Sequence, residues 1–374
     1  MTRVQSAPSH ASPRHRRRRR RLLGGRRGIL LAPLALLALI MCVAIPSSGI
    51  LATPLMLGPP VPPRTNTPVI DDAPGGEWLS GAFIGKGTDI ESIDRMGTWR
   101  NRPLDVLTVY PNRGTWAELT SSTWIFTELR AYPGTLLYGL PLVPEDGSVT
   151  LADIASGQHD AVFATLADQM RENGRGDTVV RVGWEANGPW FAWGVQARDA
   201  ALFQAAARRV MQVMSDRTPT LVMSFEVACS TPLYGATDRL AALEDLYPGD
   251  DVTDVIGCDH YDNYDWKATS REAWALALRA PDAPGLQDVV DFAREHGKRF
   301  AVSEWGLDRT SHGGLDNPLF IQLMHEFFTA NADVLAYEAY FDEPAPYIGS
   351  SLWGDSGPSL NPRAAAEYVR LWAS

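Results

Sequence analysis

Acidic residues are absent from the first part of the chain. Its first 64 residues contain no Asp or Glu but include 11 arginines, among them the unbroken run from Arg16 to Arg21. The remaining residues hold all 44 acidic side chains against 23 basic ones, so this part carries a formal net charge of about −21. Such a surface repels nucleic acid and anionic lipid. We therefore expect no nucleic-acid partner and favour a neutral or cationic ligand.

The stretch from Gly28 to Ile45 has no charged residue at all. It follows the Arg-rich residues 1–27, and basic residues before an apolar span are typical of the cytoplasmic flank of a membrane segment. Its 18 residues lie at the short end of what crosses a bilayer and overlap the longest secretory signals. The long basic region and the poor cleavage sites favour an uncleaved anchor, with a cleaved signal as the alternative.

Either outcome exports the acidic part of the chain. We therefore expect a cytoplasmic tail at residues 1–27, a transmembrane helix or signal anchor at residues 28–45 and a Pro-rich linker at residues 46–77. The globular domain at residues 78–374 is then membrane-anchored and extracytoplasmic, or secreted if the N-terminal segment is cleaved.

Cysteine is scarce, with three residues in the whole chain. Cys42 lies in the expected membrane segment. Cys229 and Cys258 fall on two neighbouring expected strands, and an exported protein permits a disulfide between them. Free thiols are the commoner state of cysteines buried in a core, and the sequence leaves this choice open.

From Trp78 onward, short apolar runs alternate with helical patterns, which is typical of repeated βα units. The runs are apolar at consecutive positions, as strands buried on both sides are. We expect eight strands, at residues 79–84, 106–110, 136–141, 178–183, 220–225, 255–258, 300–303 and 334–340. Helical periodicity is clear at residues 197–215, 286–296 and 318–330. Eight units predict an α/β fold, a (β/α)8 TIM barrel; a doubly wound open sheet is the alternative, but no Gly-rich nucleotide loop follows any strand.

Two expected strands lead into a glutamate surrounded by aromatic residues. Glu185 follows the fourth strand within the motif RVGWEANGPWFAWG at residues 181–194, and Glu304 follows the seventh within RFAVSEWG at residues 299–306. In such a barrel the carboxyl ends of the strands meet at one mouth. Cleavage of a glycosidic bond requires two carboxyl groups, one protonated and one ionised. One glutamate after a strand is more often a helix cap or an ion-pair partner, but two in matching contexts favour a catalytic pair.

These motifs resemble those of glycoside hydrolase family 26, which is known mainly for β-mannanases, with some β-glucanases and xylanases. The resemblance covers about residues 78–374. It rests on the following residues: Arg181, Glu185, Asn187, Gly188, Trp190, Trp193 and Gly194, the segment from Val302 to Gly306, and the pair Asp259 and Tyr261.

The resemblance implies a retaining mechanism with Glu185 as general acid/base and Glu304 as nucleophile. It also implies that Arg181 and Tyr261 orient Glu304 and keep it ionised, with Asp259 in support. Glu226, on the fifth strand, is either a further cleft residue or the partner of a core arginine.

Aromatic rings near the glutamates are candidates for stacking on sugars, although such rings are also ordinary core residues. We expect Trp184, Trp190, Trp193 and Trp305 to bind substrate. Trp184 stands where the family usually has His. We therefore expect less polar recognition of the sugar and stronger desolvation of Glu185, which raises the pKa of a carboxyl group and suits a proton donor.

The sequence thus predicts a retaining β-glycosidase of polysaccharides or oligosaccharides, most like an endo-acting β-1,4-mannanase. We expect a monomer with no cofactor. We also expect no metal, because Asp259, His260 and Asp262 lack a regular ligand spacing. Two alternatives are an inactive membrane-tethered glycan-binding barrel, suggested by Trp184, and a transglycosidase that remodels exported polysaccharide.

Overall fold

The computed structural model describes Ile70 and residues 78–85, 89–355 and 359–373. The predicted tail at 1–27, the membrane segment at 28–45 and all of the linker except Ile70 lie outside the described residues. Among the helices of the described part, none is long and apolar enough to cross a membrane.

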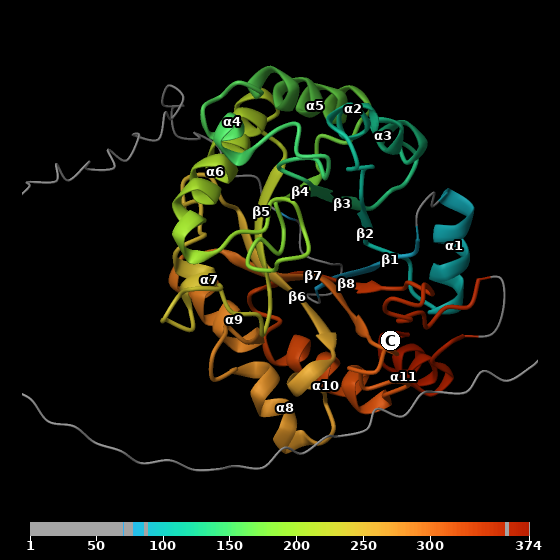
Figure 1. Cartoon of the computed structure of the whole chain (residues 1–374). Coiled ribbons are helices and arrows are strands. Elements are labelled where there is room, and N and C mark those ends of the chain that lie inside the picture. Colours follow the sequence, from blue (N-terminus) through green and yellow to red (C-terminus); the bar gives the residue numbers. More distant parts are fainter. Residues whose placement is uncertain (1–69, 71–77, 86–88, 356–358, 374) are drawn as a thin grey trace, which may run out of the picture. The chain divides into compact units, whose positions relative to one another are not determined.

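Eight parallel strands form a closed barrel in sequence order, with β8 pairing back onto β1. Figure 1 shows the strands at the centre and the helices arranged around them. The strands are β1 (Leu79–Phe83), β2 (Val106–Val109), β3 (Thr135–Leu140), β4 (Val179–Val182), β5 (Val222–Ala228), β6 (Val255–Asp262), β7 (Arg299–Leu307) and β8 (Leu335–Phe341). The closed barrel confirms the (β/α)8 prediction and excludes the open sheet.

The surrounding helices begin at recognisable capping residues. Thr115 and Glu118 form a reciprocal capping box at the start of α2, and Asp89 accepts a hydrogen bond from the Ser92 N–H at the start of α1. The helices are α1 (Ile90–Trp99), α2 (Trp116–Ser121), α3 (Trp124–Glu128), α4 (Leu151–Ala155), α5 (Asp160–Glu172), α6 (Ala200–Arg217), α7 (Ala241–Glu244), α8 (Arg271–Leu278), α9 (Leu286–Glu295), α10 (Pro318–Ala330) and α11 (Pro362–Trp372). The helix expected at 197–215 is α6 preceded by a 3-10 turn at Ala197–Asp199.

One small apolar cluster draws its residues from successive strands of the barrel. Its members include Val179 on β4, Val222 on β5 and Val255 on β6. Side chains two positions apart on a strand point the same way. Arg181, two residues after Val179, therefore lies directly above this apolar layer on the same side of β4.

Three strands extend at least three residues further at their carboxyl ends than the sequence predicts. The fifth strand was expected to end at residue 225, but β5 extends to Ala228. The sixth strand was expected to end at residue 258 and the seventh at residue 303, but β6 extends to Asp262 and β7 to Leu307. Glu304 therefore lies within β7 rather than beyond it. The register between β7 and β8 shifts between Val302 and Trp305, a local irregularity of the kind that redirects side chains beside active sites.

Cys229 and Cys258 form a disulfide across a sequence separation of 29 residues. The bond joins the residue after β5 to the middle of β6, and both cysteines are buried. Free thiols, the commoner alternative for a core, are therefore the wrong choice here. The neighbouring strands bring the two Cα atoms to 5.6 Å, within the range that a disulfide spans.

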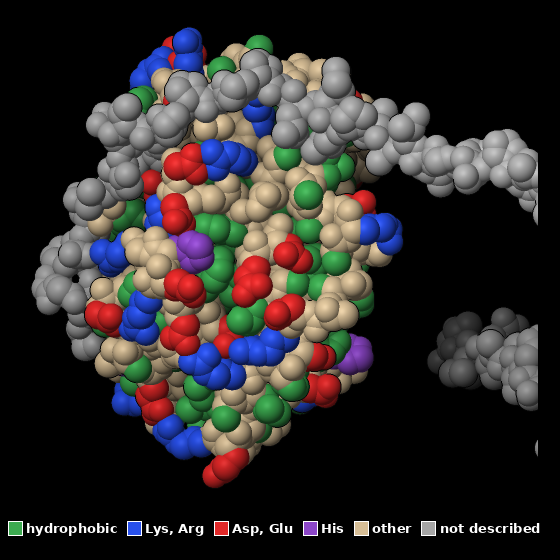
Figure 2. Space-filling model, turned by 90° about the vertical axis from the view of Figure 1, so that its left-hand side faces the viewer, with side chains coloured by type: hydrophobic (Ala, Val, Ile, Leu, Met, Phe, Trp, Pro, Cys, Tyr) green, Lys and Arg blue, Asp and Glu red, His purple; other side chains and the backbone are tan. Residues whose placement is uncertain are grey.

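The outer surface mixes both signs of charge. On the face shown in Figure 2, Lys and Arg side chains lie among Asp and Glu side chains. Exposed pairs such as Arg208 with Asp251, 2.5 Å apart, are of the kind that contributes at most about 1 kcal/mol. The excess of negative charge is thus partly offset locally and does not form a single acidic patch on this face.

Candidate active site

Arg181 lies at the centre of the barrel mouth and is completely buried. Its Nε donates to Glu226 Oε2 at 2.6 Å, and its Nη2 donates to both carboxylate oxygens of Asp259 at 2.8 and 2.7 Å. Its Nη1 donates to Glu304 Oε1 at 3.0 Å and to the Tyr110 hydroxyl at 2.7 Å. A guanidinium has five N–H donors, and all five have acceptors here. The cation is therefore fixed in position by residues on β5, β6 and β7 and by Tyr110 directly after β2.

Glu304 receives donors on both of its carboxylate oxygens. Arg181 Nη1 and the Tyr110 hydroxyl donate to Oε1, and the Tyr261 hydroxyl donates to Oε2 at 2.8 Å. Its side chain is 9% exposed. Hydrogen bonds from a cation and two phenols favour the charged form of a carboxylate. This environment suits an ionised nucleophile.

Glu185 sits on a sharp turn three residues after β4. Its φ is 54°, a left-handed conformation that costs most residues about 1–3 kcal/mol. Backbone bonds hold the turn: the Glu185 N–H donates to the Glu226 carbonyl at 3.0 Å, and the Gly188 N–H donates to the Glu185 carbonyl at 2.9 Å. Asn187 adds side-chain bonds to both backbone groups of Ala228 at the end of β5. The strained glutamate is thus anchored to the neighbouring strand.

Among the described residues, the carboxyl group of Glu185 has fewer hydrogen-bond donors than that of Glu304, and no arginine donates to it. It has one side-chain donor, the Trp190 Nε1 at 2.6 Å, and the residue is 8% exposed. Burial, together with the nearby charge of Glu304, raises the pKa of Glu185 to about 8. At neutral pH Glu185 therefore holds a proton close to a carboxylate that is paired with Arg181.

The four predicted sugar-binding tryptophans divide into one exposed ring and three buried ones. Trp190 is 51% exposed, and a Cβ at Gly188 would lie 2.2 Å from the Trp190 Cζ2, so glycine lets the indole lie against the loop. Trp184, Trp193 and Trp305 are each at most 2% exposed. Burial of this degree does not fit the predicted contact of these three rings with a sugar.

The packing of the buried tryptophans explains why they are less exposed than Trp190. Trp184 lies against Tyr110, with ring centroids 5.2 Å apart, and under the Trp193 ring, 4.6 Å away. Trp305 follows Glu304 directly in β7, so its side chain points to the opposite, outer side of the barrel. There its Nε1 donates to Glu338 at 2.6 Å and its ring stacks on Trp372 of α11.

The structure brings together the other predicted residues. Arg181, Asp259 and Tyr261 all lie within one hydrogen-bonded network with Glu304. Glu226 is the partner of the core arginine, which decides between its two predicted roles. Tyr110 was not identified from the sequence, although it stands directly after β2, where barrel strands present functional side chains.

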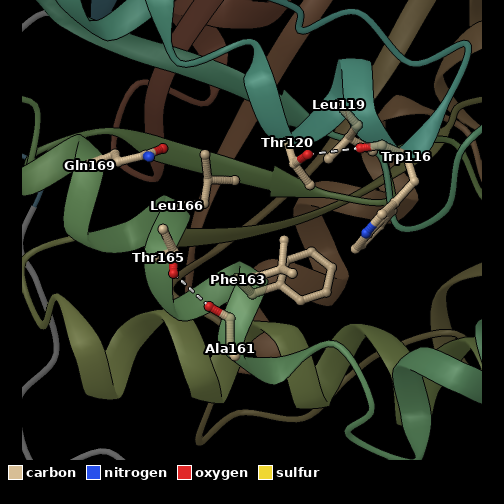
Figure 3. Close-up of a pocket in the computed structure, with 9 residues that line it drawn as sticks. Trp116, Leu119, Thr120, Ala161, Phe163, Thr165, Leu166 and Gln169 are labelled. Atoms are coloured by element: carbon tan, nitrogen blue, oxygen red, sulfur yellow. Dashed lines mark hydrogen bonds between the residues drawn. The ribbon is translucent and has the colours of Figure 1, made fainter.

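A surface hollow lies away from the barrel mouth. A cavity of about 340 Å³ opens between α2 and α5, on the helical side of the barrel. Figure 3 shows its mainly apolar lining, with Trp116 and Leu119 from α2 facing Phe163, Leu166 and Gln169 from α5. None of the buried carboxylates of the barrel mouth lines it. Within the described residues, no group of three or more His, Cys, Asp or Glu side chains is arranged to hold a metal ion.

Comparison with known protein families agrees with this geometry. Residues 155–309, which contain Arg181, Glu185 and Glu304, match the model of glycosyl hydrolase family 26. The matched segment is similar to this family of glycosyl hydrolases. The match confirms the predicted resemblance over these residues, while the residue roles stay predictions.

Individual relatives are distant. A mannan endo-1,4-beta-mannosidase from Bifidobacterium adolescentis is 28% identical over 186 residues, which is 48% of this chain. The matched region spans only 18% of that relative's own length.

Solved structures share the barrel. The YdhT protein from Bacillus subtilis has a TM-score of 0.56 and 16% identity, covering 82% of this chain and 94% of its own. The catalytic domain of a Bacillus sp. JAMB-750 family 26 endo-beta-1,4-mannanase has a TM-score of 0.56 and 15% identity, covering 80% and 86%. At such identities these two structures establish the fold alone.

Proposed function

We propose that this protein is a retaining β-glycosidase of family 26 that cuts β-1,4-linked mannan-like polysaccharide at internal positions. The observation that carries the proposal is the contrast between two neighbouring glutamates. Glu185 is buried with one side-chain donor and a pKa of about 8, whereas Glu304 accepts from Arg181 and two tyrosines. A glycosidase needs such a pair, one carboxyl group protonated and the other ionised.

In the first step Glu304 attacks the anomeric carbon, and the glycosidic C–O bond breaks. Glu185 gives its proton to the leaving oxygen, so the departing sugar leaves as a neutral alcohol. The product is a covalent glycosyl ester of Glu304. The fixed positive charge of Arg181 keeps the carboxylate of Glu304 ionised and aimed before the attack.

In the second step a water molecule attacks the ester while Glu185 takes up a proton as a base. The charge of Glu304 is one cause of the raised pKa of Glu185. Because the ester is neutral, this cause disappears in the intermediate and the pKa of Glu185 falls. The same residue therefore changes from acid to base without moving.

The substrate class is supported by the names of the relatives, several of which are endo-β-1,4-mannanases. Trp190 supports it as well, because a half-exposed indole next to the acid offers a flat face on which a pyranose ring can stack.

We also propose that the protein works outside the cytoplasm as a monomer, held to the membrane by residues 28–45 or secreted if this segment is cleaved. The Cys229–Cys258 disulfide supports an oxidising compartment.

The test incubates the purified full-length chain with β-mannan, mixed-linkage β-glucan, xylan and bacterial exopolysaccharides, beside Glu185→Gln and Glu304→Gln. Oligosaccharides released by the wild type and absent with both variants would support the proposal and identify the polymer. Proton NMR of the first products should show the β-anomer, since retention preserves configuration. Binding without release would favour the inactive glycan-binding barrel, and elongated products would favour the transglycosidase.

A further inference from the structure

Tyr110 has no assigned role in the proposed reaction, although its hydroxyl donates to Glu304. It follows β2 directly, and its hydroxyl lies between Arg181 Nη1 and Glu304 Oε1. The residue is partly exposed at the barrel mouth, whereas Arg181 beneath it is not. The phenol therefore contacts both the proposed nucleophile, Glu304, and the arginine that holds it.

The direction of its hydrogen bonds follows from the donors available. Arg181 has no acceptor atoms, so the Tyr110 oxygen accepts from Nη1 at 2.7 Å. The phenolic O–H then points to Glu304 Oε1. Burial and the carboxylates of Glu304 and Asp259 raise the pKa of Tyr110 above its ordinary value, so the phenol keeps the proton that it donates.

The ring of Tyr110 is held from two sides. Trp184 packs against one side at 5.2 Å, and Phe83 meets it edge to face at 5.5 Å. Gly139 of β3 provides the space, because a Cβ there would lie 2.5 Å from Tyr110 Cε1. Trp184, which stands where the family usually has His, therefore packs against the ring whose hydroxyl contacts Glu304.

The same rings continue to the second tyrosine. Phe83 stacks on Phe341 with centroids 4.5 Å apart, and Phe341 meets Tyr261 edge to face at 5.9 Å. The contacting rings thus run from Tyr110 through Phe83 and Phe341 to Tyr261. The tyrosines at the two ends each donate a hydroxyl to one oxygen of Glu304. Oε1 has two donors and Oε2 has one.

We propose that Tyr110 is a positioning residue that, together with Arg181, holds Oε1 of Glu304 as the non-attacking oxygen, so that Oε2, which accepts from Tyr261 alone, is the oxygen that attacks. This proposal rests on the proposed glycosidase function. The new bond joins Oε2 to the anomeric carbon, the electron pair of the broken bond goes to the leaving oxygen, and that oxygen takes the proton of Glu185. Oε1 becomes the carbonyl oxygen of the ester and keeps both donors.

The first test compares Tyr110→Phe with Tyr138→Phe. Tyr138 is a buried tyrosine of β3 whose hydroxyl has no hydrogen-bond partner among the described residues, so it serves as the matched control. Tyr110→Phe should lower kcat about 10- to 100-fold, the range for loss of one hydrogen bond to a charged group. KM should change less than threefold, and Tyr138→Phe should match the wild type in both constants.

A second variant separates positioning from mere packing. Gly139→Ala keeps the phenol but displaces the ring of Tyr110, because the added Cβ would lie 2.5 Å from Tyr110 Cε1. It should therefore lower kcat more than it changes KM, as Tyr110→Phe does, whereas Tyr138→Phe should change neither. Wild-type kcat in Tyr110→Phe would overturn the proposal.

An experiment without substrate tests the role of Tyr110 independently of the proposed glycosidase function. If the wild type cleaves no polymer, the glycosidase proposal fails, but the contact can still be measured by a double-mutant cycle of Tyr110→Phe and Glu304→Gln. Tyr110→Phe should lower the thermal midpoint more when Glu304 is present than in the Glu304→Gln background. Equal shifts in the two backgrounds would overturn the positioning role.

Discussion

Replacing the proposed acid should make the folded protein more stable. Glu185 is 8% exposed, and its pKa is raised from 4.5 to about 8. Between these values the folded state still holds a proton that the unfolded state has released. Folding stability therefore falls as pH rises through this interval, by about 1.4 kcal/mol for each pH unit.

The size of the effect follows from that interval. At pH 7 the penalty is about 3 kcal/mol, and it approaches about 5 kcal/mol at pH 8 and above. Glutamine is neutral at every pH and still offers an acceptor to the Trp190 Nε1, so Glu185→Gln should avoid the penalty. For a barrel of this size, 3 kcal/mol corresponds to a rise in melting temperature of roughly 5 °C.

The assay is thermal unfolding of the wild type and Glu185→Gln at about pH 5, 7 and 8, with Glu304→Gln as the control. The advantage of Glu185→Gln should be small at pH 5 and grow with pH. Glu304→Gln should be less stable than the wild type, because it leaves the buried Arg181 without one of its carboxylate partners. An advantage of Glu185→Gln that does not change with pH would refute the reasoning, and so would the same gain in Glu304→Gln.

Three further outcomes follow from the site and its surroundings. Activity should fall as pH rises through about 8, when Glu185 loses the proton that it donates in the proposed mechanism. Trp190→Phe should move this limb of the kcat/KM profile to higher pH, because the indole donor lowers the pKa of Glu185. An unmoved limb would contradict the role of the indole. The double variant Cys229→Ser, Cys258→Ser should lower the free energy of unfolding by about 3–4 kcal/mol, the loop-entropy value for a 29-residue separation. An unchanged urea midpoint would argue against a stabilising disulfide. Trp305→Phe should lower the melting temperature without changing KM, whereas a selective rise in KM would favour the predicted sugar contact.

The strand order could be predicted because a parallel barrel buries both faces of each strand, which leaves mainly apolar runs such as residues 136–140 of β3. The two glutamates could be found because each follows such a run within one short motif. Alternation along β7 places Trp305, the neighbour of the inward Glu304, on the outer side of the barrel, which is why its burial does not fit the predicted sugar contact.

Tyr110 had a weaker signal. One aromatic residue at the end of a strand is ordinary, and its role depends on Gly139 on β3, Trp184 in the turn after β4 and Glu304 on β7. Contacts between such distant residues leave no local pattern in a single chain. The disulfide was likewise only permitted by the sequence, because the spacing of Cys229 and Cys258 does not reveal whether the two thiols face each other.

The hydrogen bonds that assemble the mouth of the barrel connect distant points of the chain, since Arg181 and Glu304 are 123 residues apart and Tyr110 and Glu304 are 194 apart. Contacts of such long range form late in folding, after the entropy of closing the intervening chain has been lost. A nascent or partly refolded chain can therefore have most of its helices and strands and still lack a working nucleophile. During refolding, recovery of activity should lag behind recovery of secondary structure, so enzymatic turnover would report the assembly of the barrel mouth from β2, β4 and β7.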